Sequence, residues 1–129
     1  MALTIEVVID ASALLALLNS EPGAELVAEA LSTGAASAVN LCEVVAKLCD
    51  AGMPEKSIDL VMQPLGIKVP FDNEQAFQAG MLRVATKGAG LSLGDRACLN
   101  LAKKLGVPAL TADRSWAGID VGVEIKVIR

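Results

Sequence analysis

Four acidic residues follow or interrupt short hydrophobic runs in this 129-residue chain. They are Asp10 after IEVVI, Glu43 in SAVNLCE, Asp95 in LSLGD and Asp113 after PALTA. Carboxylates that lie close together repel one another and raise each other's pKa, so a fold that gathers several of them needs a divalent cation or strong hydrogen-bond donors. The pattern therefore predicts a site for Mg²⁺ or Mn²⁺, and such a site favours hydrolysis of a phosphodiester.

Each of these acids also has a simpler interpretation, because aspartate is a preferred helix N-cap and acids are favoured in the first helical turn. Asp10 would cap the segment ASALLALL, and Asp113 would cap the turn that contains Trp116. Residues 40–43 and 92–95 have the spacing of a capping box. For any one acid taken alone, capping is favoured over catalysis.

Taken together, the four acids favour a shared site, because independent helix caps have no reason to lie at one edge of a sheet. We expect Asp10 and Asp95 to be the principal metal ligands. Glu43 and Asp113 would complete the coordination or hold metal-bound waters. Short hydroxyl side chains flank the acids and would support them: Ser12, Ser92 and Thr111.

Alternating strand and helix patterns should bring these acids together. Short apolar runs, of which the first is rich in β-branched residues, predict strands at residues 4–9, 35–39, 67–71, 108–112 and 124–128. Helical spacing predicts helices at 11–18, 24–31, 40–50, 54–65, 72–87 and 94–105. This order indicates one domain over residues 1–129, a three-layer α/β/α sandwich with a mainly parallel sheet. Ligands of such sheets bind beyond the carboxyl ends of the strands, which is where the acids fall.

The composition excludes several kinds of chemistry. The chain has no histidine, which removes Ser-His-Asp and Cys-His catalysis and any imidazole base. Cys42, Cys49 and Cys98 lack CxxC spacing, so we expect no zinc site and no disulfide, and we interpret all three as reduced and buried. Neither a membrane span nor a signal peptide is indicated, which favours the cytoplasm.

The net charge of −4 argues against a surface that binds nucleic acid by broad electrostatic attraction. It argues less against a nuclease, because a bound divalent cation neutralises part of a carboxylate site. Among the basic residues of the C-terminal half, Arg96 and Arg114 are candidates for contacts with phosphate. Such residues are equally typical of solvated helix faces.

Three blocks of the sequence carry a more specific signal. They are VVIDASALLALL with Asp10, SAVNLCEV with Asn40 and Glu43, and LSLGDRACLNLAKKLGVPALTADRSW with Asp95 and Asp113. Together they resemble the PIN domain and, within that group, the VapC-like ribonuclease toxins of toxin–antitoxin pairs. The resemblance spans nearly the whole chain, although residues 53–87 contain no motif that aligns.

The resemblance implies an α/β sandwich, usually dimeric, that cleaves RNA with Mg²⁺ or Mn²⁺ held by the four acids and is silenced by a protein antitoxin. Ser12, Asn40 and Thr111 would be supporting polar groups. Two alternatives stay open, a catalytically silent PIN-like binding module and a PIN nuclease of RNA processing outside such a pair. A haloacid-dehalogenase-type phosphatase is disfavoured, because it would have an aspartate at the position of Ser12. A phosphotransfer receiver is also disfavoured, because it would have a lysine where this chain has Asp113 and Arg114.

Overall fold

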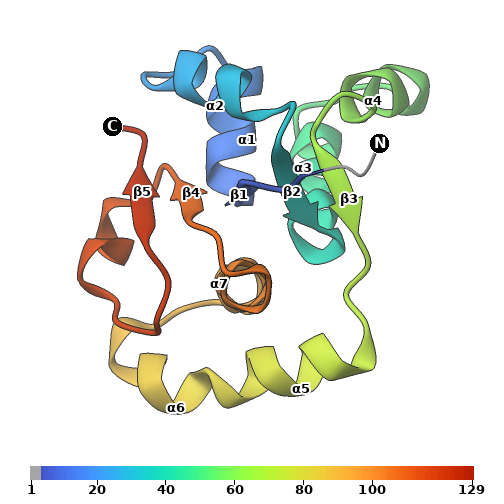
Figure 1. Ribbon diagram of the computed structural model, residues 1–129. Helices are drawn as coiled ribbons and strands as arrows, with labels where there is room; N and C mark the ends of the chain where they lie inside the picture. The colour runs from blue at the N-terminus through green and yellow to red at the C-terminus, as the bar shows by residue number, and fades with distance from the viewer. Residues whose placement is uncertain (1–3) are drawn as a thin grey trace.

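A sheet of five parallel strands forms the centre of the protein (Figure 1). The computed structural model describes residues 4–129. Because the strand order is β3-β2-β1-β4-β5, β1 is central and the chain builds the sheet outward from it in both directions. The strands are β1 Val7–Ile9, β2 Gly34–Ser37, β3 Ile67–Val69, β4 Ala109–Thr111 and β5 Ile125–Val127.

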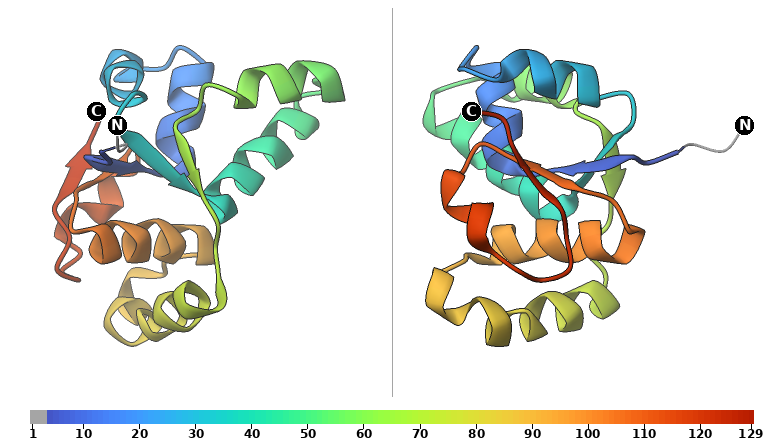
Figure 2. Two further views of the ribbon diagram at one scale, coloured as in Figure 1. Left: turned by 45° about the vertical axis from the view of Figure 1, so that its right-hand side comes forward. Right: turned by 60° about the vertical axis from the view of Figure 1, so that its left-hand side comes forward.

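Helices cover both faces of this sheet, as the sequence predicts (Figure 2). The first four helices lie on one side, α7 lies on the other, and α5 and α6 pack on the outer side of α7 (Figure 1). No helix within residues 4–129 is long and apolar enough to cross a membrane. The helices are α1 Ala11–Leu18, α2 Ala24–Ala30, α3 Ala38–Asp50, α4 Glu55–Met62, α5 Asn73–Met81, α6 Arg83–Thr86 and α7 Leu93–Leu105, with 3₁₀ turns η1 Lys87–Ala89 and η2 Arg114–Gly118.

Two apolar cores, one on each face of the sheet, hold the layers together. Successive residues of β1 point to opposite faces, as the period of a strand requires. Val7 and Ile9 pack among residues of α1 to α4, whereas Val8 packs with α7 and the fully buried Trp116. Because β1 is buried on both faces, the residue that follows it, Asp10, enters an environment of low dielectric constant.

The strands are shorter than predicted, and one predicted helix is broken. β3 ends at Val69 instead of residue 71, because Pro70 has no N–H to continue the ladder. The helix predicted at residues 72–87 is divided into α5, α6 and η1, with the first break at Leu82. Gly80 lies just before this break, and glycine is a poor helix former.

The prediction that all three cysteines are buried is wrong for two of them. Helix α3 directs Val44 and Leu48 into the core. Cys42 and Cys49, seven residues apart on the same helix, therefore share a different face and are exposed. Cys98 is buried, and all three thiols are free, as expected.

Candidate active site

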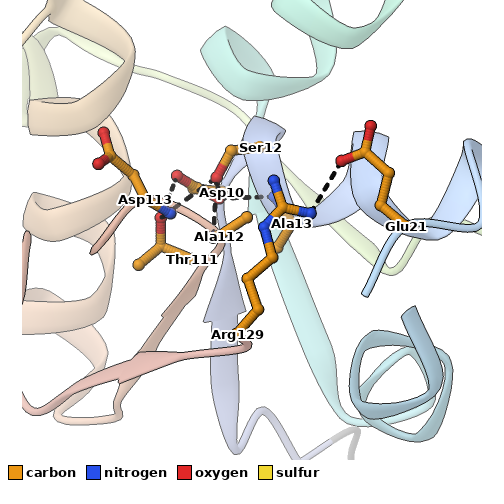
Figure 3. A network of polar contacts seen from close by, with 8 residues as sticks. All are labelled: Asp10, Ser12, Ala13, Glu21, Thr111, Ala112, Asp113 and Arg129. Carbon is orange, nitrogen blue, oxygen red and sulfur yellow. Dashed lines mark hydrogen bonds and ion pairs between the residues drawn. The ribbon is translucent and has the colours of Figure 1, made fainter. Parts of the chain in front are cut away.

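Asp10 directly follows β1 and is also the N-cap of α1, so both roles considered from the sequence meet in one side chain. Only 4% of it is exposed. Its Oδ1 accepts hydrogen bonds from the Ala13 N–H (2.9 Å) and the Ser12 hydroxyl (2.7 Å) (Figure 3). Its Oδ2 accepts a hydrogen bond from the Thr111 hydroxyl (2.8 Å). Three donors therefore orient this carboxylate.

The electrostatic state of Asp10 is unusual for an aspartate. Burial raises the pKa of its carboxyl from 3.8 to about 6. The three hydrogen bonds oppose this change in pKa, while the charge of Asp95 adds to it. Desolvation therefore outweighs the donors, and the ionised carboxylate is only partly compensated. A divalent cation beside it would supply the missing compensation, so Asp10 has the properties of a metal ligand.

Ser12 and Thr111 join the ends of β1 and β4, although they are 99 positions apart in the sequence. The Ser12 Oγ accepts a hydrogen bond from the Ala112 N–H (2.9 Å) and lies 3.2 Å from the Thr111 Oγ1. The Thr111 Oγ1 in turn accepts one from the Asp113 N–H (3.0 Å) (Figure 3). These hydroxyls fix the two strand ends around Asp10, which is the supporting position predicted for them.

Asp113 is the least enclosed of the four acids. Its Oδ1 accepts hydrogen bonds from the Ser115 N–H (2.9 Å) and the Ser115 hydroxyl (2.7 Å), so it caps η2 as the simpler interpretation predicts. The side chain is exposed and points away from Asp10 (Figure 3). A local change of rotamer would be needed to turn this carboxylate toward Asp10.

Glu43 is positioned from α3 by Asn40. The capping box considered for residues 40–43 is wrong, because α3 begins two residues before Asn40 and Ser37 is its N-cap. The Asn40 Nδ2 instead donates to the Glu43 Oε1 and to the Gly94 carbonyl, both at 3.0 Å. A side chain at Gly94 would collide with the Glu43 carboxylate, whose Cδ lies 2.5 Å from the position of a Cβ. Glycine at this position thus leaves room for the Glu43 carboxylate at the start of α7.

Asp95 lies in the first turn of α7, where the predicted capping box with Ser92 is confirmed. The Ser92 N–H donates to the Asp95 Oδ2 (3.0 Å), and the Asp95 N–H donates to the Ser92 Oγ (3.2 Å). This pair holds the start of α7 and fixes one oxygen of the carboxylate. Asp95 therefore serves the helix terminus and also faces the site.

One cavity of about 200 Å³ brings the four acids together. Three of them also lie near the buried Cys98 thiol. Burial is the main cause that raises the pKa of this thiol, and the charges of Asp10, Asp95 and Glu43 raise it further. None of the four acids takes part in an ion pair within residues 4–129. The cavity is lined by Asp10, Ala11, Ser12, Leu15, Asn40, Glu43, Lys47, Asp95 and Asp113.

The donor set of this cavity fits a hydrated hard cation. Its anionic groups are all carboxylates, and the Asn40 Oδ1 is a further buried oxygen that has no hydrogen-bond partner. In the described part of the chain, no three acidic or cysteine side chains are close enough to enclose an ion directly. Mg²⁺ tolerates such spacing, because it keeps several waters and is usually bound by one or two carboxylates.

Lys47 also lines the cavity, and sequence reasoning does not single it out. The signal for it is its position four residues after Glu43, on the same face of α3.

The two arginines predicted to contact phosphate lie outside the cavity wall. The Arg96 guanidinium donates to a carbonyl of α5 (3.1 Å), and the Arg114 Nε donates to the Arg129 carbonyl (3.0 Å). Their contacts with phosphate stay predictions.

The structure is thus an α/β protein whose acidic pocket lies beyond the carboxyl ends of parallel strands. The model of the PIN domain matches residues 7–122. The chain belongs to the PIN-domain family. No curated protein matches its sequence.

Solved structures share this fold over nearly the whole chain. A toxin–antitoxin complex from Klebsiella pneumoniae is 19% identical, with a TM-score of 0.74 over 96% of this chain and 98% of that chain. DNA-bound VapBC from Salmonella typhimurium is 18% identical, with a TM-score of 0.77 over 98% of this chain and 100% of that chain. VapC20 of Mycobacterium tuberculosis, a toxin that cleaves the sarcin-ricin loop, is 19% identical, with a TM-score of 0.68 over 92% of this chain and 99% of that chain. At these identities the likeness is one of fold.

Proposed function

We propose that this protein is a metal-dependent endoribonuclease and the toxin of a toxin–antitoxin pair. The observation that carries the proposal is the cavity that gathers Asp10, Glu43, Asp95 and Asp113, with no ion pair to any of them in the residues described. The names of similar structures support it, because they include toxin–antitoxin complexes and a toxin that cleaves the sarcin-ricin loop.

Asp10 and Asp95 would hold Mg²⁺ or Mn²⁺, and Glu43 and Asp113 would hold its waters. The bound ion would supply a water of lowered pKa and stabilise the oxygen that leaves phosphorus. Because the chain has no histidine, these carboxylates are also the available acceptors for the proton of the attacking water.

The remaining polar residues of the site position these carboxylates. The hydroxyls of Ser12 and Thr111 donate hydrogen bonds to the two carboxylate oxygens of Asp10, one to each. Asn40 holds one oxygen of Glu43 and anchors it to the start of α7. Asp10, Glu43 and Asp95 therefore come from separate segments but are oriented before any substrate binds, which reduces the cost of reaching the reactive arrangement. Asp113 would join them after a change of rotamer.

A protein antitoxin is the partner that we propose. An apolar groove of about 570 Å³ between α3 and α4 is lined by Leu41, Val45, Ile58 and Met62, with charged residues beside them. An amphipathic segment of another protein would bury its apolar face there. The product of the adjacent reading frame should copurify with the chain and stop cleavage of RNA, and such a toxin would act in the cytoplasm.

We also propose that the protein forms a homodimer. On α5 and α6, the exposed fractions of Phe77, Met81 and Val84 are 71%, 56% and 79%, and contiguous apolar surface of this kind marks interaction sites. Val84→Glu should convert the dimer to a monomer in size-exclusion chromatography with light scattering. A Val84→Glu protein that keeps the mass of the dimer would contradict this assignment.

Cleavage of a labelled single-stranded RNA tests the proposed activity. The purified chain should cut the RNA in MnCl₂, lose activity in EDTA and regain it when Mn²⁺ is restored. Asp10→Asn and Asp95→Asn should fold but fail to cut, whereas Asp120→Asn, outside the cavity, should cut normally. Asp10→Asn that cleaves at the parental rate would refute the assignment.

A catalytically silent binding module is the second candidate, and the cap bonds made by Asp10, Asp95 and Asp113 favour it. Titration with Mn²⁺ separates the two, because a dedicated metal site raises the melting temperature in a saturable way. The rise should disappear in Asp10→Asn. A PIN nuclease of RNA processing would behave like the toxin in both assays but would lack an antitoxin encoded beside it.

A further inference from the structure

A second pocket lies directly beside the acidic cavity, and its walls are mostly apolar. Its volume of about 480 Å³ falls within the range of small-ligand sites, roughly 300–1,000 Å³. Glu43 lines both hollows, so the pocket adjoins the acidic site at this residue. The other walls are formed by the first turns of α3, the start of α7 and the link between β3 and α5, with Val39, Cys42, Phe71 and Leu93.

Starting from the endoribonuclease function proposed above, we propose that this pocket receives one unpaired base of a single-stranded RNA whose phosphate lies in the acidic cavity. Bases adjoin every phosphate of an RNA strand, so a strand placed at Glu43 brings a base to the apolar side. The pocket wall contains no basic residue, and it therefore does not suit a second phosphate. Its apolar surface and the ring of Phe71 suit the flat face of a base.

The composition of the wall also indicates what the pocket would select. Stacking on an aromatic ring tolerates any base, because every base has a π-face. The Ser92 Oγ accepts the capping-box bond from the Asp95 N–H, so its O–H and the Glu43 carboxylate are the few side-chain groups of the wall that are left to read a base edge. A base within a duplex is stacked on its neighbours and cannot enter. The pocket therefore selects an unpaired strand and discriminates little between bases.

Hydrogen bonds hold the chain on both sides of Phe71 before any ligand binds. The Gln75 Nε2 donates to the Pro70 carbonyl (3.1 Å), and the Gln75 N–H donates to the Asp72 Oδ1 (2.9 Å). Gln75 itself is 3% exposed. These bonds fix the residues on both sides of Phe71, so little backbone freedom is lost when a base stacks on the ring.

Steady-state cleavage of a short, fluorescein-labelled single-stranded RNA of mixed sequence tests this site. Phe71→Ala should raise KM about tenfold and leave kcat unchanged, since stacking acts on binding. Phe71→Leu, which keeps apolar packing but removes the ring, should also raise KM and serves if the alanine variant melts early. Leu60→Ala, at a residue 67% exposed on α4, is the control and should leave KM unchanged. Unchanged KM in both Phe71 variants would overturn the proposal.

Alkylation of thiols provides a readout that does not depend on cleavage. In Asp10→Asn, the same RNA should slow the reaction of N-ethylmaleimide with Cys42, in the pocket wall, several-fold. Cys49, exposed on the same helix but outside that wall, should react at an unchanged rate. Equal rates at Cys42 with and without RNA would overturn the proposal.

The two assays separate the failure of this proposal from failure of the proposed function. Protection of Cys42 that Phe71→Ala abolishes, in a chain that cuts no RNA, would support the base pocket and refute the nuclease. Cleavage that is indifferent to Phe71, with Cys42 unprotected, would refute the base pocket and leave the nuclease standing. Loss of dimer mass or of antitoxin binding in Phe71→Ala, with KM unchanged, would assign the pocket to a protein partner and also refute the proposal.

Discussion

The ends of β1 and β4 have the same local pattern, a short buried strand followed by an aspartate that caps the next helical turn, yet the two aspartates differ in their surroundings. Asp10 is 4% exposed and accepts hydrogen bonds from three residues. Asp113 is exposed, and both hydrogen bonds to its carboxylate come from Ser115. Asp10 follows its strand immediately, whereas Asp113 lies two residues beyond β4.

This difference teaches that burial, more than residue type or spacing, decides how a carboxylate of the site behaves. Thr111 and Ser12 cover Asp10 with hydroxyls that also hold the two strands together. The pKa of Asp10 is raised to about 6 mainly because water is excluded from it. Asp10 is therefore suited to direct binding of a metal, and Asp113 to a secondary role.

The largest expected effect is on catalysis. Asp10→Asn should reduce RNA cleavage to the uncatalysed background, because it removes a carboxylate that we propose as a direct ligand of the metal. Asp113→Asn should reduce the rate roughly 10- to 100-fold, as is typical when a group that supports a metal site is lost. Initial rates at saturating Mn²⁺ measure both. Equal losses in the two variants would remove the distinction between the two strand ends.

In the absence of metal, Asp10→Asn should make the protein more stable, although the same substitution abolishes cleavage. Because the pKa of Asp10 is raised from 3.8 to about 6, the folded protein binds this proton more tightly than the unfolded chain does. The free energy of unfolding should therefore fall as pH rises from about 4 to about 6, by about 3 kcal/mol. Asp10→Asn carries no charge and should be more stable than the parent at about pH 7, by up to this amount.

Urea unfolding in EDTA at about pH 4 and at about pH 7 measures this difference. The gain from Asp10→Asn should be small at the lower pH, where the parental carboxyl is protonated in the folded state and only partly ionised in the unfolded chain. An equal gain at both pH values would show that the charge of Asp10 is not its cause.

Thr111→Val should have an intermediate effect. The hydroxyl donates to Asp10 and accepts from the Asp113 N–H, so its loss should cost about 1–3 kcal/mol of unfolding free energy. Since this hydrogen bond lowers the pKa of Asp10, the acid limb of the activity profile should move to higher pH. Thr111→Ser keeps the hydroxyl and should restore both properties. An acid limb of the activity profile that stays at the same pH in Thr111→Val would contradict the role assigned to Thr111.

Ser115→Ala should have the smallest effect. It removes one of the two hydrogen bonds to Asp113 at an exposed position, so the unfolding free energy should change by no more than about 0.5 kcal/mol. Thermal unfolding provides the measurement. A loss comparable to that of Thr111→Val would mean that the end of β4 is as tightly built as the end of β1.

Much of the site could be predicted because its local rules are strong. Strand and helix patterns predict the parallel sandwich, and cap preferences predict the bonds made by Asp10, Asp95 and Asp113. The same rules fail at Asn40, whose spacing to Glu43 looks like a capping box. There the competing cap, Ser37, begins the helix earlier and frees Asn40 for a contact with Gly94, 54 positions away.

The sequence by itself determined which groups are available, namely four carboxylates without a histidine and the strands that carry them to one edge. Only the tertiary structure decided that Asp10 is buried, that Lys47 reaches the same cavity, and that Phe71 and Glu43 both line the adjacent pocket. The reason is physical. Helix and strand periodicity depends on neighbours within a few residues, whereas burial and the partners of a side chain depend on segments that meet only after the sheet is assembled.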